Sequence, residues 1–218
     1  ALYALQAFAP SGGAGNRTSM RGGGPLVTLV DPAAGGPLWE IVWANVPCGA
    51  PQGTEALPWT RPTRVSDKGQ VTYPPPGTTA AVETFFGMPR RLRLVFDEGL
   101  VTGVVQRPWG TNYGGWRHPL TPYYRLKAGD EPLPVHPRAG AFGYRNWLGV
   151  VVKAEKAAKS EKAELIREQA AAITDYIART RESEGLAAQI IVAGWAMDNM
   201  KPRDFILSRQ PLVALGPE

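Results

Sequence analysis

Near the start of the chain, residues 9–25 combine glycine with arginine in a pattern that could bind an anion. The stretch holds six glycines and two arginines, Arg17 and Arg21, and it has no acidic residue. Because glycine lacks a Cβ, its backbone amides can approach a surface that a larger residue would keep away. Arginine beside such a backbone favours phosphate or carboxylate partners. We therefore interpret this stretch as a loop that presses its backbone onto nucleic acid.

Two other interpretations of this loop stay open from its residues alone, a plain connector and a cradle for a small phosphorylated ligand. The chain contains no Gly-x-x-x-x-Gly-Lys-Ser/Thr sequence. Gly13 and Gly15 lack a third glycine at the spacing of a dinucleotide-binding turn. The cradle is therefore the weaker alternative.

Residues that commonly carry catalysis or bind metals are sparse. The chain has one cysteine, Cys48, and two histidines, His118 and His136. No nucleophile, base and carboxylate can be recognised as a catalytic set, and these scattered side chains do not form a typical zinc site. We expect no enzyme activity, no metal and no cofactor. We also expect a buried thiol at Cys48 and a reducing, cytoplasmic environment, since no disulfide can form within the chain.

The net charge of +5 lies in the first part of the chain. Residues 1–150 hold twelve arginines, two lysines and nine acidic residues, whereas the basic and acidic residues of 151–218 balance. A basic set in residues 90–127 is interleaved with tryptophan and tyrosine and faces only Asp97 and Glu98. This composition suits nucleic acid or a protein surface, although a solvated strand face would look the same. No apolar run is long enough to span a membrane.

Hydrophobic patterning predicts an α+β fold with antiparallel hairpins, long ordered loops and one long helix. In the first hairpin we expect Leu92, Leu94 and Phe96 to face the core, with Arg91 and Arg93 facing outward. The predicted elements are a strand at 26–30, a short helix at 38–46, a second short helix at 80–86, a hairpin at 91–106, an amphipathic helix at 153–183 and a second hairpin at 186–213. Long loops cover 47–79 and 107–145 because proline and glycine are frequent there.

Four strings in the chain, taken together, resemble CasA, the large subunit of the type I-E CRISPR Cascade complex. They occur in the family's order and are APSGGAGNRTSMRGGGP at 9–25, GMPRRLR at 87–93, NYGGWRHPL at 112–120 and GWAMDNM at 194–200. The resemblance implies that residues 1–218 are part of the family's N-terminal domain. Residues 1–150 then form its basic, loop-rich region, and the family's C-terminal four-helix bundle is absent.

The resemblance also implies a function without catalysis. Such a subunit recognises the PAM in double-stranded DNA through the minor groove, promotes strand opening for guide RNA pairing, and helps recruit the helicase-nuclease. Its expected partners are target DNA with a PAM, the guide RNA complex, the other Cascade subunits and the helicase-nuclease effector, with no membrane. The alternatives are a non-catalytic scaffold domain that binds protein partners and a phosphate-binding enzyme.

Three elements of the family carry DNA contact, and each maps onto positions here. They are a glycine loop, a basic side chain in the groove and a hairpin-tip wedge. By resemblance, the DNA-binding residues are Gly12, Gly13, Gly15, Asn16 and Arg17 in the loop, Arg107 in the groove, and Asn199, Met200 and Lys201 at the tip. The wedge is often a glutamine in the family, whereas this chain has Met200, a side-chain type that can pry base steps apart.

Overall fold

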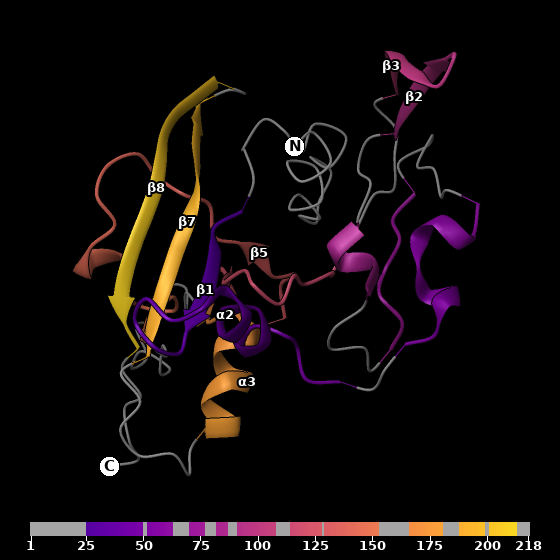
Figure 1. The fold of residues 1–218 in the computed structure, drawn as a ribbon. Coiled ribbons are helices and arrows are strands. Elements are labelled where there is room, and N and C mark those ends of the chain that lie inside the picture. The colour runs from indigo at the N-terminus through magenta and orange to yellow at the C-terminus, as the bar shows by residue number, and fades with distance from the viewer. Residues whose placement is uncertain are drawn as a thin grey trace.

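The computed structural model in Figure 1 describes residues 25–49, 52–62, 70–76, 82–86, 91–107, 114–127, 129–152, 166–180, 188–198 and 201–212. Within these ranges the fold is α+β, as the sequence predicts, with antiparallel sheets and two α-helices. The strands are β1 (Val27–Asp31), β2 (Arg91–Asp97), β3 (Leu100–Arg107), β4 (Tyr123–Arg125), β5 (Leu133–Pro134), β6 (Ile166–Glu168), β7 (Gln189–Asp198) and β8 (Lys201–Pro211). The helices are α2 (Leu38–Ala44), α3 (Ala171–Thr180) and the short 3-10 turns Thr54–Ala56, Pro58–Thr60, Val82–Phe86 and Tyr144–Asn146.

The largest sheet has the order β1-β7-β8 and joins two segments that lie far apart in the chain. β1 pairs antiparallel with β7, with Val27 opposite Ala193 and Asp31 opposite Gln189. β7 and β8 form a long hairpin in the region where the sequence predicts one, visible as the two gold strands in Figure 1. β-Branched residues alternate toward the interior of β1 and β7, as period-two patterning requires, and four of them are fully buried: Thr28, Val30, Ile190 and Val192.

Among the described residues no further strand pairs with the outer edge of β1, which is covered by side-chain and loop hydrogen bonds. The Asn45 side chain accepts from the Val30 backbone N–H at 2.8 Å and donates to the Val30 carbonyl at 2.8 Å. Nearer the start of the strand, the Thr28 backbone N–H donates to the Leu120 carbonyl at 2.8 Å. Asn45 also donates to the carbonyl of Ile41 in α2. These bonds satisfy an edge that would otherwise invite unwanted strand pairing.

Helix α3 is shorter than the sequence predicts. The expected helix at 153–183 is confined in the described residues to Ala171–Thr180, where Ile173 and Tyr176 face the core beside β1. Ile166–Glu168 is a strand that pairs with β4, so tertiary pairing overrides the helical periodicity of that segment. The remainder of the predicted helix, 153–165 and 181–183, lies outside the described residues.

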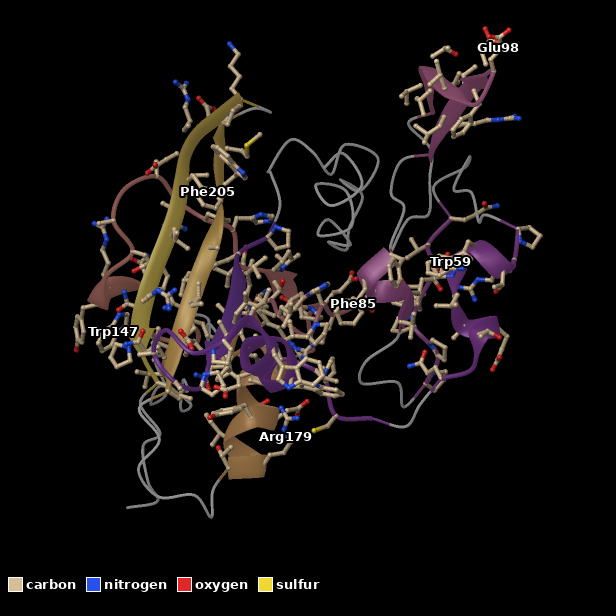
Figure 2. The ribbon with its side chains drawn as sticks, in the orientation of Figure 1. Trp59, Phe85, Glu98, Trp147, Arg179 and Phe205 are labelled. Atoms are coloured by element: carbon tan, nitrogen blue, oxygen red, sulfur yellow. The ribbon has the colours of Figure 1, made fainter. Side chains whose placement is uncertain are left out.

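The β2–β3 hairpin forms as predicted, but its burial is not as predicted. Glu98 and Gly99 both take positive φ, 47° and 80°, as a two-residue hairpin turn requires. Leu94 and Phe96, expected in the core, are 50% and 60% exposed, because no other described layer covers this pair of strands. Figure 1 shows the hairpin projecting from the upper right of the molecule, and Figure 2 places Glu98 at its tip. The side chain of Leu92 is not described.

Neither α-helix in the described ranges is long and apolar enough to cross a bilayer.

Candidate nucleic-acid interface

The β7–β8 hairpin extends well beyond the strand that pairs with it. β1 begins at Val27, opposite Ala193, whereas β7 continues through residues 194–198, where β8 is its only partner strand among the described residues. At about 3.3 Å per residue, the overhanging part is about 17 Å long. The two-stranded arm therefore stands out from the sheet and presents its tip to solvent.

The same end of the sheet receives the glycine-rich stretch of the chain. Residues 9–25 lead directly into β1, whose first residue lies where the overhang begins. Just before β1, the Leu26 backbone N–H donates to the Val135 carbonyl at 2.7 Å and fixes the position of this entry. The described backbone thus brings the end of the glycine-rich stretch beside the base of an arm that starts about 170 residues later in the chain.

Most of the predicted DNA-binding residues lie outside the described residues. This holds for Gly12, Gly13, Gly15, Asn16 and Arg17 in the loop and for Asn199 and Met200 at the arm's tip. Lys201 is described: it is the first residue of β8, is exposed, and pairs with Asp198 across the turn. The structure therefore places Lys201 at the tip, and DNA contact by all nine residues stays a prediction.

The side chains near the tip carry charge and an aromatic pair. Arg203 donates to Asp198 Oδ2 through both Nη2 and Nε, the latter at 3.2 Å, and both side chains are exposed. Such an exposed pair contributes little to stability and leaves Lys201 as an exposed cation beside it. Trp195 and Phe205 lie opposite each other in the register with ring centroids 4.9 Å apart, and each is nearly half exposed. Figure 2 shows Phe205 on the arm.

Close packing anchors the arm where it leaves the sheet. The loop that follows β5 carries Pro137, which packs against Gly194 of β7. A Cβ added at Gly194 would lie 2.5 Å from Pro137 Cγ, so the loop can approach β7 this closely only because residue 194 is glycine. Three residues further along the loop, the Gly140 backbone N–H donates to Asp204 Oδ2 of β8 at 2.9 Å. The loop thereby contacts both strands of the arm.

The far end of β8 is fixed by polar contacts. Trp147, labelled in Figure 2, donates its indole N–H to Gln210 Oε1 at 2.9 Å. Arg209 Nη1 donates to Oδ2 of Asp31 at 2.6 Å, and Asp31 is fully buried. A buried carboxylate needs such a partner, because an isolated buried charge is costly. The arm therefore projects from a base that is held at several points.

Arg107 is not brought to this arm by the described contacts. It is the last residue of β3 and pairs in register with Arg91, and its side chain is not described. The main partner of β3 is β2, and the two lie on the opposite side of the view from β7–β8 in Figure 1. Its predicted role in the groove stays a prediction.

Part of the basic set at 90–127 is neutralised by a carboxylate that the sequence analysis missed. Glu168 of β6 pairs with Arg117 and with Arg125, the latter through Oε1 at 3.1 Å from Nη2. Arg117 also lies over the Tyr123 ring, 5.5 Å from its centroid. Glu168 is distant in sequence and falls within the predicted helix, so no local signal paired it with these arginines.

His118 is a buried neutral residue. Its backbone N–H donates to Tyr123 Oη at 2.7 Å, and its Nδ1 accepts from the Leu120 backbone N–H at 3.2 Å. Burial lowers the pKa of His118 to about 4 and raises the pKa of Tyr123 to about 12. These contacts give the imidazole a structural role in the turn that leads into β4.

Cys48 is exposed, so the expectation of a buried thiol is wrong. It follows α2 and Pro47, where its backbone N–H donates to Asp175 Oδ2 at 3.0 Å, and this bond holds the residue at the surface. Among the described residues, no group of three or more His, Cys, Asp and Glu side chains is placed to hold a metal ion.

The fold is α+β, and its two-stranded arm carries the exposed Lys201 at the tip and receives the end of the glycine-rich stretch at its base. Residues 1–217 match the family described as CRISPR-associated protein Cse1, and the chain belongs to that family. Among curated proteins, none matches the chain.

Two solved structures from Thermus thermophilus show the same fold, and a third from that organism is reported beside them. One, titled as a CRISPR associated protein, is 20% identical with a TM-score of 0.54, over 95% of this chain and 43% of that chain. A CasA structure from the same organism is 21% identical with a TM-score of 0.51, over 86% and 37%. A third, titled CasA (Cse1), is 20% identical with a TM-score of 0.48, over 95% and 45%. The present chain therefore spans less than half the length of these relatives.

Proposed function

We propose that the chain is the DNA-sensing part of the large subunit of a type I-E Cascade complex. In this role it recognises the PAM of double-stranded target DNA from the minor groove. It then promotes strand opening for pairing with the guide RNA, and it contributes to the surface that recruits the helicase-nuclease. Its function is binding and not catalysis, and it takes place in the cytoplasm with the guide RNA complex and the other Cascade subunits as partners.

One observation carries this proposal: the glycine-rich stretch enters the sheet at the base of the β7–β8 arm. Two segments that the resemblance marks for DNA contact thus join the sheet at the same end. The minor groove is about 6 Å wide, so a bare backbone loop fits where long side chains do not. An arm about 17 Å long can reach the neighbouring base pairs from the same anchor.

Charge at the tip supports the same assignment. Lys201 is exposed at the start of β8, next to residues predicted to separate the first base pairs. A cation there attracts phosphates of either strand. A wedge beside it then has to offset only the free-energy cost of unstacking one or two base steps. Opening then proceeds by exchange of a DNA duplex for an RNA–DNA duplex of similar stability, without nucleotide hydrolysis.

The proposal is tested by rebuilding the guide-loaded complex with variants of this chain. Gly13→Asp places a carboxylate in an acid-free loop and is expected to weaken PAM-dependent duplex binding at least about tenfold in a gel-shift assay. Arg93→Glu is the matched control, because Arg93 is an exposed basic residue on β2 and is not among the proposed contacts. Equal binding by wild type and Gly13→Asp would refute the role of the loop.

The same complexes separate recognition from opening. Lys201→Glu combined with Met200→Ala is expected to reduce permanganate reactivity of the opened bases more than it reduces initial binding. Footprints of equal intensity in this variant and the wild type would count against the wedge. If the affinity for the other Cascade subunits depends neither on salt concentration nor on DNA, the result would instead favour a scaffold that binds only protein. Turnover of a phosphorylated small molecule in the absence of DNA would favour the enzyme alternative.

A further inference from the structure

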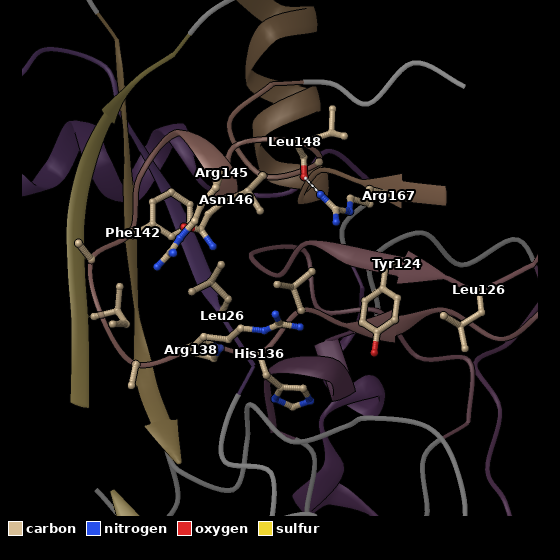
Figure 3. Close-up of a pocket in the computed structure, with 17 residues that line it drawn as sticks. Leu26, Tyr124, Leu126, His136, Arg138, Phe142, Arg145, Asn146, Leu148 and Arg167 are labelled. Atoms are coloured by element: carbon tan, nitrogen blue, oxygen red, sulfur yellow. Dashed lines mark hydrogen bonds between the residues drawn. The ribbon is translucent and has the colours of Figure 1, made fainter. Parts of the chain in front are cut away.

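A pocket of about 740 Å³ lies at the base of the arm. Its walls come from the loop at 135–149, from Tyr124 of β4, from Arg167 of β6 and from Ile206 of β8, as Figure 3 shows for most of these residues. Leu26, the residue just before β1, also lines it. The pocket thus sits between the end of the glycine-rich stretch and the β7–β8 arm.

Three arginines give this pocket a positive charge. Arg138 comes from the loop, Arg145 from the 3-10 turn at Tyr144–Asn146, and Arg167 from β6. None of the described lining residues is acidic, and none of the three arginines forms an ion pair with another described residue. Three arginines that line one pocket without a described carboxylate are a site for an anion that the described part of the chain does not supply.

The pocket is built and not a gap between surface side chains. Arg167 Nη1 lies 3.4 Å from the Leu148 carbonyl, which orients its side chain along the wall. Gly149, with φ of +75°, packs so closely on Arg167 that a Cβ there would collide with its side chain. The turn at 147–149 therefore holds Arg167 in place. Figure 3 shows the hydrogen bond from Arg167 to the Leu148 carbonyl at the upper rim of the pocket.

Aromatic side chains supply a second kind of contact. Tyr124 and Phe142 both line the pocket and are half-buried, so each ring keeps part of its surface accessible. In Figure 3 Arg138 extends into the middle of the pocket, with Tyr124 on the opposite side. An aromatic face beside several arginines is the combination that binds unpaired nucleotides, because the base stacks while the phosphates meet the cations.

We propose that this pocket binds a short stretch of single-stranded DNA, with a base against Tyr124 and the flanking phosphates on Arg138, Arg145 and Arg167. The volume lies within the range of about 300–1,000 Å³ that suits an organic ligand, and it exceeds what a lone phosphate needs. The inference rests on the proposed function for the source of the strand. A strand released at the tip would have to run about 17 Å along β8 from Lys201 to reach Ile206.

The test uses the whole chain and a labelled short oligothymidylate, with binding followed by fluorescence anisotropy over a range of salt concentrations. Replacing two of the arginines, Arg138→Gln with Arg145→Gln, is expected to weaken binding at least about tenfold. It should also reduce the slope of log affinity against log salt by about 1.4, at about 0.7 for each phosphate contact on a single strand. Arg93→Gln, a loss of charge on β2, is the control and should leave both quantities unchanged.

Tyr124→Leu separates stacking from charge. It is expected to weaken oligonucleotide binding about tenfold with the salt slope unchanged, because stacking releases no counterions. Inorganic phosphate should compete only weakly with the oligonucleotide. Competition by phosphate as strong as that by the oligonucleotide, or binding unaffected by both the arginine and the tyrosine variants, would overturn the proposal.

These outcomes are independent of the PAM experiment. If duplex binding by the rebuilt complex does not depend on the PAM while the chain still binds the oligonucleotide through these residues, the proposed function is refuted and the proposal for the pocket is supported. If duplex binding depends on the PAM but the two arginine substitutions leave oligonucleotide binding unchanged, the proposal for the pocket is refuted and the proposed function is supported.

Discussion

Mild acid should destabilise the fold through His118. The imidazole is almost fully buried, and burial lowers its pKa from 6.5 to about 4. The unfolded chain therefore takes up a proton between these two pH values, whereas the folded chain does not. Since the unfolded state binds more protons in this window, the free energy of unfolding falls as the pH falls from about 6.5 to about 4.

The size of this effect follows from the two pKa values. A folded pKa that lies one unit below the unfolded pKa is worth about 1.4 kcal/mol, so the difference between 6.5 and about 4 at His118 accounts for a loss of at most about 3–4 kcal/mol across the window. Below about pH 4 both states are protonated and the contribution levels out. Such a loss is a large share of the roughly 5–15 kcal/mol that is typical of a folded domain.

The assay is urea unfolding of the chain, followed by tryptophan fluorescence at several pH values between about 7.5 and 4. His118→Gln keeps an acceptor for the Leu120 backbone N–H and removes the titration, so its stability should fall less steeply with acid. Identical pH profiles for wild type and His118→Gln would refute the reasoning, because other groups would then carry the whole dependence.

Two further predictions concern the elements that hold the arm. Asn45→Ala should lower the free energy of unfolding by about 3 kcal/mol in urea titrations, because it leaves two buried backbone groups of β1 unpaired. Asn45→Asp retains the acceptor but sets a buried carboxylate against the Val30 and Ile41 carbonyls, so it should cost at least as much, and a loss well below about 1 kcal/mol in either variant would contradict this account. Gly194→Ala should cost about 1–3 kcal/mol, since its Cβ would meet Pro137. Faster proteolysis within 135–143 would report the displaced loop, and Gly103→Ala, whose Cβ has ordinary contacts, is the control.

The elements with strong local patterns could be predicted from the sequence. The strand before Asp31, the helix at 38–46 and both hairpins lie within a few residues of their expected positions. In each, alternation or a turn sequence such as Asp97-Glu98-Gly99 decides the local structure without help from distant residues. The α+β class followed from these elements together.

The errors arise where distant parts of the chain decide. The segment at 166–168 has helical spacing, yet it is a strand because β4 offers it hydrogen bonds and because Glu168 meets two arginines there. Leu94 and Phe96 alternate as core residues do, yet no described layer covers them. Alternation shows which side chains share a face, but it does not show whether another element packs on that face.

In the candidate site, too, the local features could be predicted from the sequence and the arrangement in space could not. Composition alone marks the glycine-rich stretch, and the resemblance marks the tip, but neither shows that both are anchored at one end of one sheet. The pocket arginines were missed because they come from a loop, a 3-10 turn and a strand, with no spacing to connect them. Once β1 pairs with β7, the loop at 135–149 must pass beneath the arm, held by Gly194 and Gly140, and it carries Arg138 and Arg145 with it. The pairing that sets the arm beside the glycine-rich entry thus also assembles the basic pocket, so a change that loosens this base should impair both.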